Sequence, residues 1–184
     1  MKIIHQSIFL VLSLGLLYGQ PTITGVALAA NNSTIAVTFS EAVYNTNGGS
    51  GSLQASDFSL SITGGTATVS SATPTSISPS GNTYTLGIGL TGTPDGSELL
   101  AVVPVDDGIY DAAGNEASTT QSNNTATLND QLLPTITSVS LAADNSTIAV
   151  TFSEAVYNTN GGSGALQSSD FSFSIGPSSG LGTV

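Results

Sequence analysis

The side chains of this chain that can do chemistry are carboxylates. The 184-residue sequence has 12 Asp and Glu residues, 1 Lys or Arg, 1 His and no Cys, with a formal net charge of -11. The only cation, Lys2, and the only imidazole, His5, stand at the start of the sequence. A catalyst made from the remaining residues lacks the usual activators of a nucleophile and a group that titrates near neutral pH. The only remaining routes to catalysis are carboxylate chemistry and a bound metal.

Six carboxylates are candidate ligands for a calcium ion. Ca²⁺ takes about six to eight oxygen ligands at about 2.4 Å, and a chain without cations offers clustered carboxylates no internal counter-charge. The candidates are Glu41, Asp106, Asp107, Asp111, Asp130 and Glu154. Ordinary turns are the competing interpretation, because Asp, Asn and Gly bond the local backbone in turns. The acidic spacing of an EF-hand loop is not present in the sequence.

The enzymatic alternative is a glycosidase that uses Glu41 and Asp107 as its acid and base. Such a pair needs two carboxyl groups about 5–10 Å apart in a cleft shaped for a sugar. The small β-sandwich that the strand pattern predicts has flat loops and no Trp, so it offers no such cleft. We therefore expect no enzymatic activity.

Sugar binding without catalysis is a stronger alternative. It requires exposed aromatic rings, and the candidates are three tyrosines predicted on loops, Tyr44, Tyr110 and Tyr157. Tyr84 occupies the same alternate positions as the apolar residues of its predicted strand and is therefore expected in the core. Loop tyrosines more often pack within their own loop, so a carbohydrate-binding module is the second hypothesis.

Residues 1–19 are predicted to be a secretory signal peptide. Lys2 supplies the positive start, residues 8–17 supply a short apolar segment, and Gly19 offers a cleavage position before Gln20. The apolar segment is shorter than the roughly 20 residues that cross a bilayer. A retained anchor or a buried strand is the alternative. We expect an exported protein, secreted or at the cell surface, with no membrane insertion, and its lack of cations excludes nucleic acid as a partner.

An internal repeat organises the chain. Residues 21–62 recur as residues 134–175, 113 positions later, and 36 of the 42 positions are identical. The six differences are Gly25/Ser138, Ala27/Ser140, Asn31/Asp144, Ser52/Ala165, Ala55/Ser168 and Leu60/Phe173. This period exceeds the roughly 20–50 residues of solenoid repeats and matches a domain. We expect one complete repeat over 20–133 and the first part of a truncated second repeat over 134–184, within a longer tandem array in which neighbouring repeats are partners.

The hydrophobic period within each repeat is two. Ile35, Val37 and Phe39 alternate with small polar residues, as expected of a strand with one buried face. Residues 99–105 are apolar on both parities, which predicts a central strand packed on both sides or a bulge. The predicted strands are 23–29, 34–40, 57–62, 66–71, 83–90, 98–105 and 124–129. They favour an all-β, antiparallel two-sheet immunoglobulin-like sandwich. A closed barrel is the alternative, and the alternating Ile, Val, Leu and Phe argue against disorder.

Strand direction places the candidate ligands. If successive strands alternate in direction, the loop at 41–47 and the loop at 106–111 lie at the same end of the repeat. Residues 129–130 of the first repeat then reach the corresponding end of the second, near Glu154. We therefore expect the calcium candidates to gather where two repeats meet.

Two short motifs resemble a known family. Residues 38–43, Thr-Phe-Ser-Glu-Ala-Val, recur at 151–156 and are similar to the TFSE-x-V signature of SbsA-type bacterial Ig-like domains. Residues 111–115, Asp-Ala-Ala-Gly-Asn, resemble the D-x-x-G-N loop late in the same domains. The resemblance covers all of 21–133 and the first half of a second domain. It implies a surface-exposed, tandemly repeated module of S-layer, adhesin or large secreted proteins. The expected function is non-catalytic spacing or adhesion, with surface glycans or proteins as candidate partners.

Overall fold

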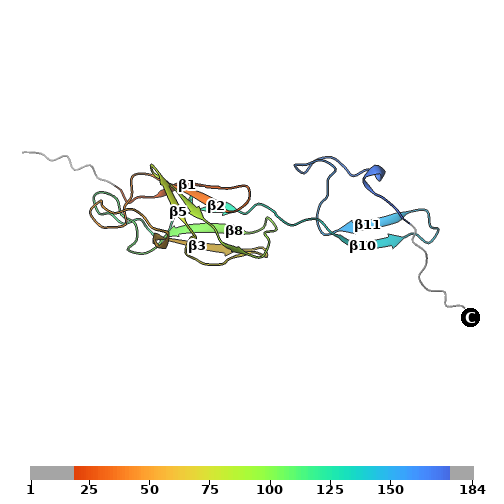
Figure 1. The fold of residues 1–184 in the computed structure, drawn as a ribbon, viewed down its shortest axis with the longest axis horizontal. Helices are drawn as coiled ribbons and strands as arrows, with labels where there is room; N and C mark the ends of the chain where they lie inside the picture. Colours follow the sequence, from red (N-terminus) through yellow and green to blue (C-terminus); the bar gives the residue numbers. More distant parts are fainter. Residues whose placement is uncertain (1–18, 175–184) are drawn as a thin grey trace, which may run out of the picture. The chain divides into compact units, whose positions relative to one another are not determined.

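The computed structural model describes residues 19–174, so most of the predicted signal peptide, 1–18, and the end of the second repeat, 175–184, lie outside the described residues. The chain divides into two compact units, Met1–Leu132 and Leu133–Val184, called unit 1 and unit 2 below (Figure 1). No helix among residues 19–174 has the length and apolar character needed to cross a bilayer.

The first sheet of unit 1 has four antiparallel strands in the order β1-β2-β6-β5. Their bounds are Ile23–Leu28 for β1, Thr34–Phe39 for β2, Ile77–Ser80 for β5 and Thr83–Gly87 for β6. The period-two pattern of β2 determines which face is buried. Ile35, Val37 and Phe39 face the core, while the intervening residues are half-exposed.

The second sheet has the strand order β3-β8-β9, again antiparallel. Its strands are β3 (Phe58–Thr63), β8 (Leu99–Pro104) and β9 (Thr125–Thr127). A two-stranded ladder joins β4 (Thr68–Val69) to β7 (Leu90–Thr91). A short 3-10 turn, Ala55–Asp57, precedes β3.

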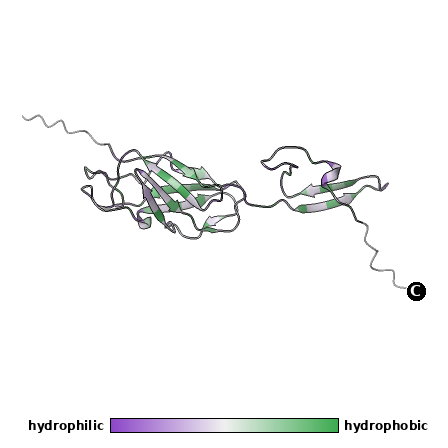
Figure 2. Cartoon of the chain, turned by 45° about the horizontal axis from the view of Figure 1, so that its top comes forward, coloured by the Kyte–Doolittle hydropathy of each residue, from purple (hydrophilic) through white to green (hydrophobic). Residues whose placement is uncertain are grey.

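One apolar core holds the sheets of unit 1 together (Figure 2). At its centre the rings of Phe39 from β2, Tyr84 from β6 and Phe58 from β3 lie 6.0–6.2 Å apart between centroids. This spacing lies within the favourable range for aromatic pairs, about 4.5–7 Å. Because the three rings come from both sheets, they join the two layers. The other buried members include Ile23, Leu60, Leu86, Leu100, Val102, Ile109 and Leu128.

The all-β, antiparallel prediction is confirmed, and the packed sheets are consistent with the predicted sandwich. The predicted strands do not include β5, which contains Pro79. Proline lacks an N–H donor, but β5 is an edge strand, where that loss is tolerated.

The predicted strand 83–90 is wrong in its second half. β6 ends at Gly87, whose N–H donates to the carbonyl of Ser76 and whose carbonyl accepts from Thr75. A Cβ on Gly87 would lie 2.3 Å from the Thr75 hydroxyl and 3.1 Å from the Ser76 backbone nitrogen, so a larger residue here would require these neighbours to shift. The chain then leaves the first sheet and forms β7.

The expectation for 99–105 also needs correction. β8 is central in its sheet, yet only one of its faces is buried. Leu100 and Val102 are fully buried, whereas Leu99 is 42% and Val105 37% exposed. Only one face of β8 is therefore packed in the core.

Unit 2 repeats the start of unit 1. Its strands β10 (Ile136–Leu141) and β11 (Ile148–Phe152) pair in the register of β1 and β2, with a bulge at the equivalent place. The 3-10 turn Ser168–Asp170 repeats Ala55–Asp57, and the Asp170 carboxylate accepts from the backbone N–H of Gln167 at 2.8 Å. The two stretches therefore share local structure as well as sequence.

Candidate functional site

Two loops of unit 1 meet at one end of the sandwich, as the alternating strand directions predict. The backbones of Tyr44 and Tyr110 form a two-way bridge, with both N–H to carbonyl distances at 2.8 Å. This bridge brings the loop after β2, which begins at Glu41, beside the loop that carries Asp106, Asp107 and Asp111.

Asp111 closes its own loop. Its fully buried carboxylate accepts from the backbone N–H groups of Ala113 and Asn115, both at 2.8 Å, and from the Asn115 side-chain amide at 2.7 Å. Burial raises the pKa of Asp111, but the hydrogen bonds from Asn115 and Ala113 outweigh it, so the pKa is lowered. Gly114 adopts a φ of 88° between them. The D-x-x-G-N pattern is thus the sequence of a loop whose first residue accepts hydrogen bonds from the residues that follow it.

Asp106 and Asp107 are exposed at this end. Asp107 has a left-handed φ of 56°, and its N–H donates to the Glu116 carboxylate at 2.6 Å. The Tyr110 hydroxyl donates to Asp107 at 3.2 Å. Burial, together with this hydrogen bond to Asp107, raises the pKa of Tyr110. These contacts tie the 106–116 loop to itself.

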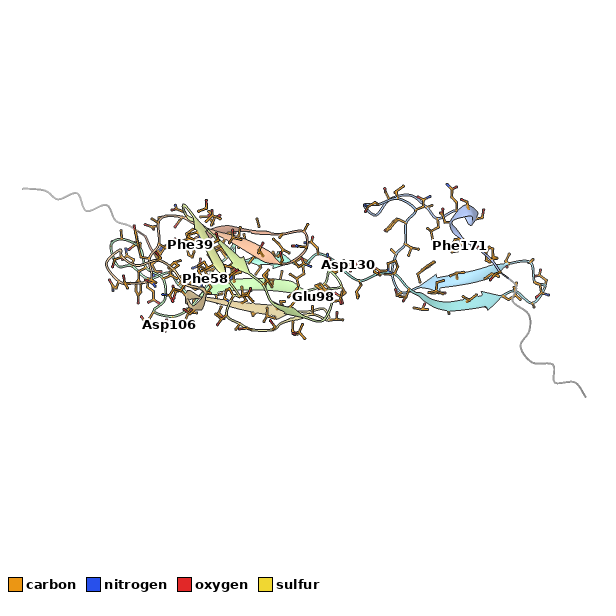
Figure 3. The ribbon with its side chains drawn as sticks, in the orientation of Figure 1. Phe39, Phe58, Glu98, Asp106, Asp130 and Phe171 are labelled. Carbon is orange, nitrogen blue, oxygen red and sulfur yellow. The ribbon has the colours of Figure 1, made fainter. Side chains whose placement is uncertain are left out.

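No set of three acidic, His or Cys side chains within residues 19–174 is arranged to hold a metal. Asp106 and Asp130 lie at opposite ends of unit 1 (Figure 3). Asp130 accepts from the N–H of Leu132 at 2.8 Å. Glu154 is half-buried in unit 2. Calcium bound by the predicted residues where two repeats meet therefore stays a prediction, as does the glycosidase pair of Glu41 and Asp107.

A carboxylate outside the predicted set is buried and accepts several backbone hydrogen bonds. Glu98 is fully buried at the end of unit 1 that holds Asp130 (Figure 3). Its carboxylate accepts from the backbone N–H groups of Thr66 and Ala67, both at 2.9 Å, and from those of Asp95 and Gly96, at 3.1 and 3.2 Å.

The pKa of Glu98 reflects two opposing effects. Burial favours the neutral acid, but hydrogen bonds from the backbone of Ala67, Thr66 and Asp95 stabilise the anion more, and they lower the pKa to about 2. At Gly65 the backbone passes so close that a Cβ would lie 2.2 Å from the Glu98 carboxyl carbon. Glu98 therefore holds two loops together as a buried anion. Its shared parity with the buried Leu100 and Val102 was the sequence signal for this burial.

The tyrosines divide between core and surface. Tyr84 is 7% exposed and donates to the carbonyl of Val43 at 3.3 Å, as expected of a core residue. Tyr44 and Tyr110 are half-buried, and Tyr157 is 50% exposed. A hollow of about 160 Å³ lies beside Tyr44, between Leu53, Pro79 and Tyr84.

Comparison with known proteins gives one distant likeness. No protein-family model and no curated protein matches the chain. The structure is similar to the crystal structure of the N-terminal part of the bacterial S-layer protein SbsC. The TM-score is 0.43 and the identity 24%, over 66% of this chain and 26% of that chain. A likeness at this level assigns neither a function nor a ligand to the present chain.

Proposed function

We propose that the chain is a non-catalytic, exported module of tandem Ig-like β-sandwich repeats that acts as a spacer or adhesin at the cell surface. The observation that carries the proposal is the repeat itself. The first 42 residues of one β-sandwich recur 113 residues later with the same strand register. Such repetition of domain-sized units is what an extended structural array requires.

The strand order supports an immunoglobulin-like topology. An immunoglobulin constant-type sandwich has strands ABED in one sheet and CFG in the other. Taken in chain order, β1, β2, β6 and β5 occupy the places of A, B, E and D, and β3, β8 and β9 those of C, F and G. The Cys and Trp residues of antibody domains have no counterpart in the sequence.

The termini of unit 1 suit a spacer. The N–H of Ile23, at the start of β1, donates to the Gln121 side chain at 2.8 Å. Asn32, in the turn after β1, holds Asn129 through its amide: its oxygen accepts from the Asn129 N–H at 2.9 Å, and its NH₂ donates to the Asn129 carbonyl at 2.8 Å. The first and last strands therefore run side by side in one direction, and the chain enters and leaves unit 1 at opposite ends. Tension along the chain would load these contacts in shear.

Single-molecule pulling on the full chain tests the spacer role. We expect unit 1 to resist and then unfold in one cooperative event, with a length gain of about 3.5 Å for each unfolded residue. Asn129→Ala should lower the unfolding force, because it removes side-chain donors to Ala29 and Asn32, whereas the exposed control Asn123→Ala should not. Gradual extension of unit 1 at low force would rule out a load-bearing spacer. Antibody labelling of intact source cells tests the surface location.

Sugar binding is the second candidate, supported by the hollow beside Tyr44. Its walls combine the rings of Tyr44 and Tyr84 with Ser52 and with apolar residues such as Leu53 and Pro79. Glycan-array binding that disappears in Tyr44→Ala would favour this function. An array without signal would leave the spacer proposal alone.

A further inference from the structure

An Asn or Asp that precedes a glycine can undergo a spontaneous backbone reaction. The backbone nitrogen of the following residue attacks the side-chain carbonyl carbon, and glycine leaves that nitrogen unhindered because it has no Cβ. The structure separates the pairs of this kind by what the glycine N–H donates to. The sequence contains four such pairs: Asn47-Gly48, Asp95-Gly96, Asp107-Gly108 and Asn160-Gly161.

Both Asp-Gly pairs have a glycine nitrogen that is already hydrogen-bonded. The N–H of Gly96 donates to the buried Glu98 carboxylate at 3.2 Å. The N–H of Gly108 donates to the carbonyl of Val105 at 3.0 Å. A nitrogen held in this way cannot turn toward the preceding side chain until its hydrogen bond breaks. These hydrogen bonds therefore oppose the reaction at both aspartates.

The Asn47-Gly48 pair lacks this restraint. Within residues 19–174, neither the N–H of Gly48 nor the side-chain amide of Asn47 makes a hydrogen bond. The loop is closed on either side of the pair, where the N–H of Thr46 donates to the carbonyl of Ser50 at 3.2 Å. Asn47 is exposed, and a Cβ built on Gly48 meets no atom within 4 Å beyond its chain neighbours. The nitrogen and the carbon that would react are thus both accessible.

The loop that carries this pair packs against the loop that Asp111 closes. A Cβ on Gly114 would overlap the side-chain oxygen of Asn47. A Cβ on Gly49 would lie 2.8 Å from the Cα of Ala112. A change of charge or of backbone length at Asn47 would therefore act where the two loops of unit 1 meet.

We propose that Asn47 is a site of spontaneous deamidation in the folded protein, with water as the co-reactant. The Gly48 nitrogen loses its proton and bonds to the side-chain carbonyl carbon of Asn47, and the amide nitrogen leaves as ammonia. The product is a cyclic succinimide. Water then opens this ring at either of its carbonyl carbons, which gives aspartate or isoaspartate. In sum, an amide and a water are converted into a carboxylic acid and ammonia.

The modification adds negative charge to a chain that is already acidic. Each event introduces a carboxylate into a sequence with a formal net charge of -11. Isoaspartate also lengthens the backbone by a carbon atom between residues 47 and 48. The same pair recurs at Asn160-Gly161, so the site is repeated with the module. The proposal goes beyond the spacer role and does not depend on it.

Peptide mapping by mass spectrometry tests the proposal on the full chain. The chain is incubated at mildly alkaline pH, folded in buffer and unfolded in urea. Cleavage after Tyr and Leu releases residues 45–53 and 158–166, which differ in mass because Ala165 replaces Ser52. Deamidation exchanges an NH₂ group for an OH group and is read as a mass gain. Isomerisation of the two Asp-Gly pairs is followed by chromatography of the peptides 91–99 and 101–110.

We expect Asn47 to react in the folded chain within about threefold of its rate in urea, because exposed loops open with little free energy. Isomerisation of Asp95 and Asp107 should be at least about tenfold slower in the folded chain than in urea, since a hydrogen bond must break first. Asn47→Gln is the matched variant and should abolish the mass gain in residues 45–53, because Gln holds its amide farther from the attacking nitrogen. The gain in residues 158–166 should not change in that variant.

Three results would overturn the proposal. A larger slowing at Asn47, of the size expected for Asp95 and Asp107, would show that the folded loop prevents the attack. A mass gain in residues 45–53 that persists in Asn47→Gln would assign the reaction to Asn45 instead. No mass gain in either buffer or urea would show that the pair does not react. None of these results bears on how unit 1 unfolds under force, so the proposal and the spacer role fail separately.

Discussion

Glu98 is the residue on which two loops of unit 1 depend. Its carboxylate is the common acceptor for N–H groups at 66–67 and at 95–96. These donors are close to a buried carboxylate, so an uncharged or truncated side chain would leave some of them without a strong acceptor. Hydrogen bonds to charged groups contribute about 1.5–3 kcal/mol each in mutational series. Glu98 therefore stabilises the end of the sandwich opposite the 41–47 and 106–111 loops.

Glu98→Gln is expected to lower the free energy of unfolding at pH 7 by about 2 kcal/mol, because the amide loses the charge and one acceptor atom. The pKa of Glu98 is about 2 in the folded state, against 4.5 ordinarily. The stabilisation is thus complete above the unfolded pKa and is lost as the pH falls from about 4.5 towards 2. Urea unfolding of both proteins between pH 7 and 2 measures this. The two curves should converge at low pH, and Asp106→Asn should run parallel to the wild type.

Asp111 gives a second prediction at this scale. Asp111→Asn should lower the melting temperature, because the part-buried N–H groups of Ala113 and Asn115 lose a charged acceptor. If Asp111 serves only its loop, the decrease is the same in EDTA and in millimolar Ca²⁺. A decrease seen only with Ca²⁺ would instead identify Asp111 as a metal ligand.

At the scale of elements, the alternating apolar pattern was sufficient to predict those strands that have one buried face and one solvent-exposed face. Residues 34–39 and 58–63 form strands because Ile35, Val37, Phe58 and Leu60 alternate with small polar residues. β5 and the end of β6 depend on tertiary contacts instead. The position of Pro79 at a sheet edge and the approach of Thr75 to Gly87 have no local signature.

The candidate site was less predictable than the strands. The sharing of one end by the 41–47 and 106–111 loops followed from strand direction alone, and the Tyr44–Tyr110 bridge agrees with it. The parity that Glu98 shares with Leu100 and Val102 indicates the buried face, but its role did not follow from this, because an acidic residue is ordinarily exposed. Two of its four backbone donors come from residues about 30 positions away in sequence.

The Leu60/Phe173 difference provides a test of packing between the sheets. Leu60 is 2% exposed and pairs with Val102 across β3 and β8. Leu60→Phe in unit 1 should lower the free energy of unfolding by about 1–3 kcal/mol through overpacking. Ala27→Ser, another natural difference between the repeats but at an exposed position, should change it by less than about 0.5 kcal/mol. Chemical denaturation measures both. A neutral Leu60→Phe would show that the core has room for the larger side chain.

For the whole molecule, the two units differ in what they bury. Unit 1 encloses its apolar residues within its own two sheets, while unit 2 presents the same kinds of residue to its surroundings. The acidic composition, with a net charge of -11, opposes association between chains through mutual repulsion. An exposed apolar face is therefore carried by a chain whose charge limits non-specific association.

This division predicts that residues 20–132 unfold at the same temperature alone as within the full chain, since the described core of unit 1 is formed by residues between 23 and 128. The dye ANS, which binds exposed apolar surface, should fluoresce more strongly with the full chain than with the shortened one. Calorimetry and dye titration at matched concentration measure both. The replacement Ile148→Ser in the full chain should reduce the dye signal and leave the melting of unit 1 unchanged. A lower melting temperature for the shortened chain would mean that unit 2 stabilises unit 1.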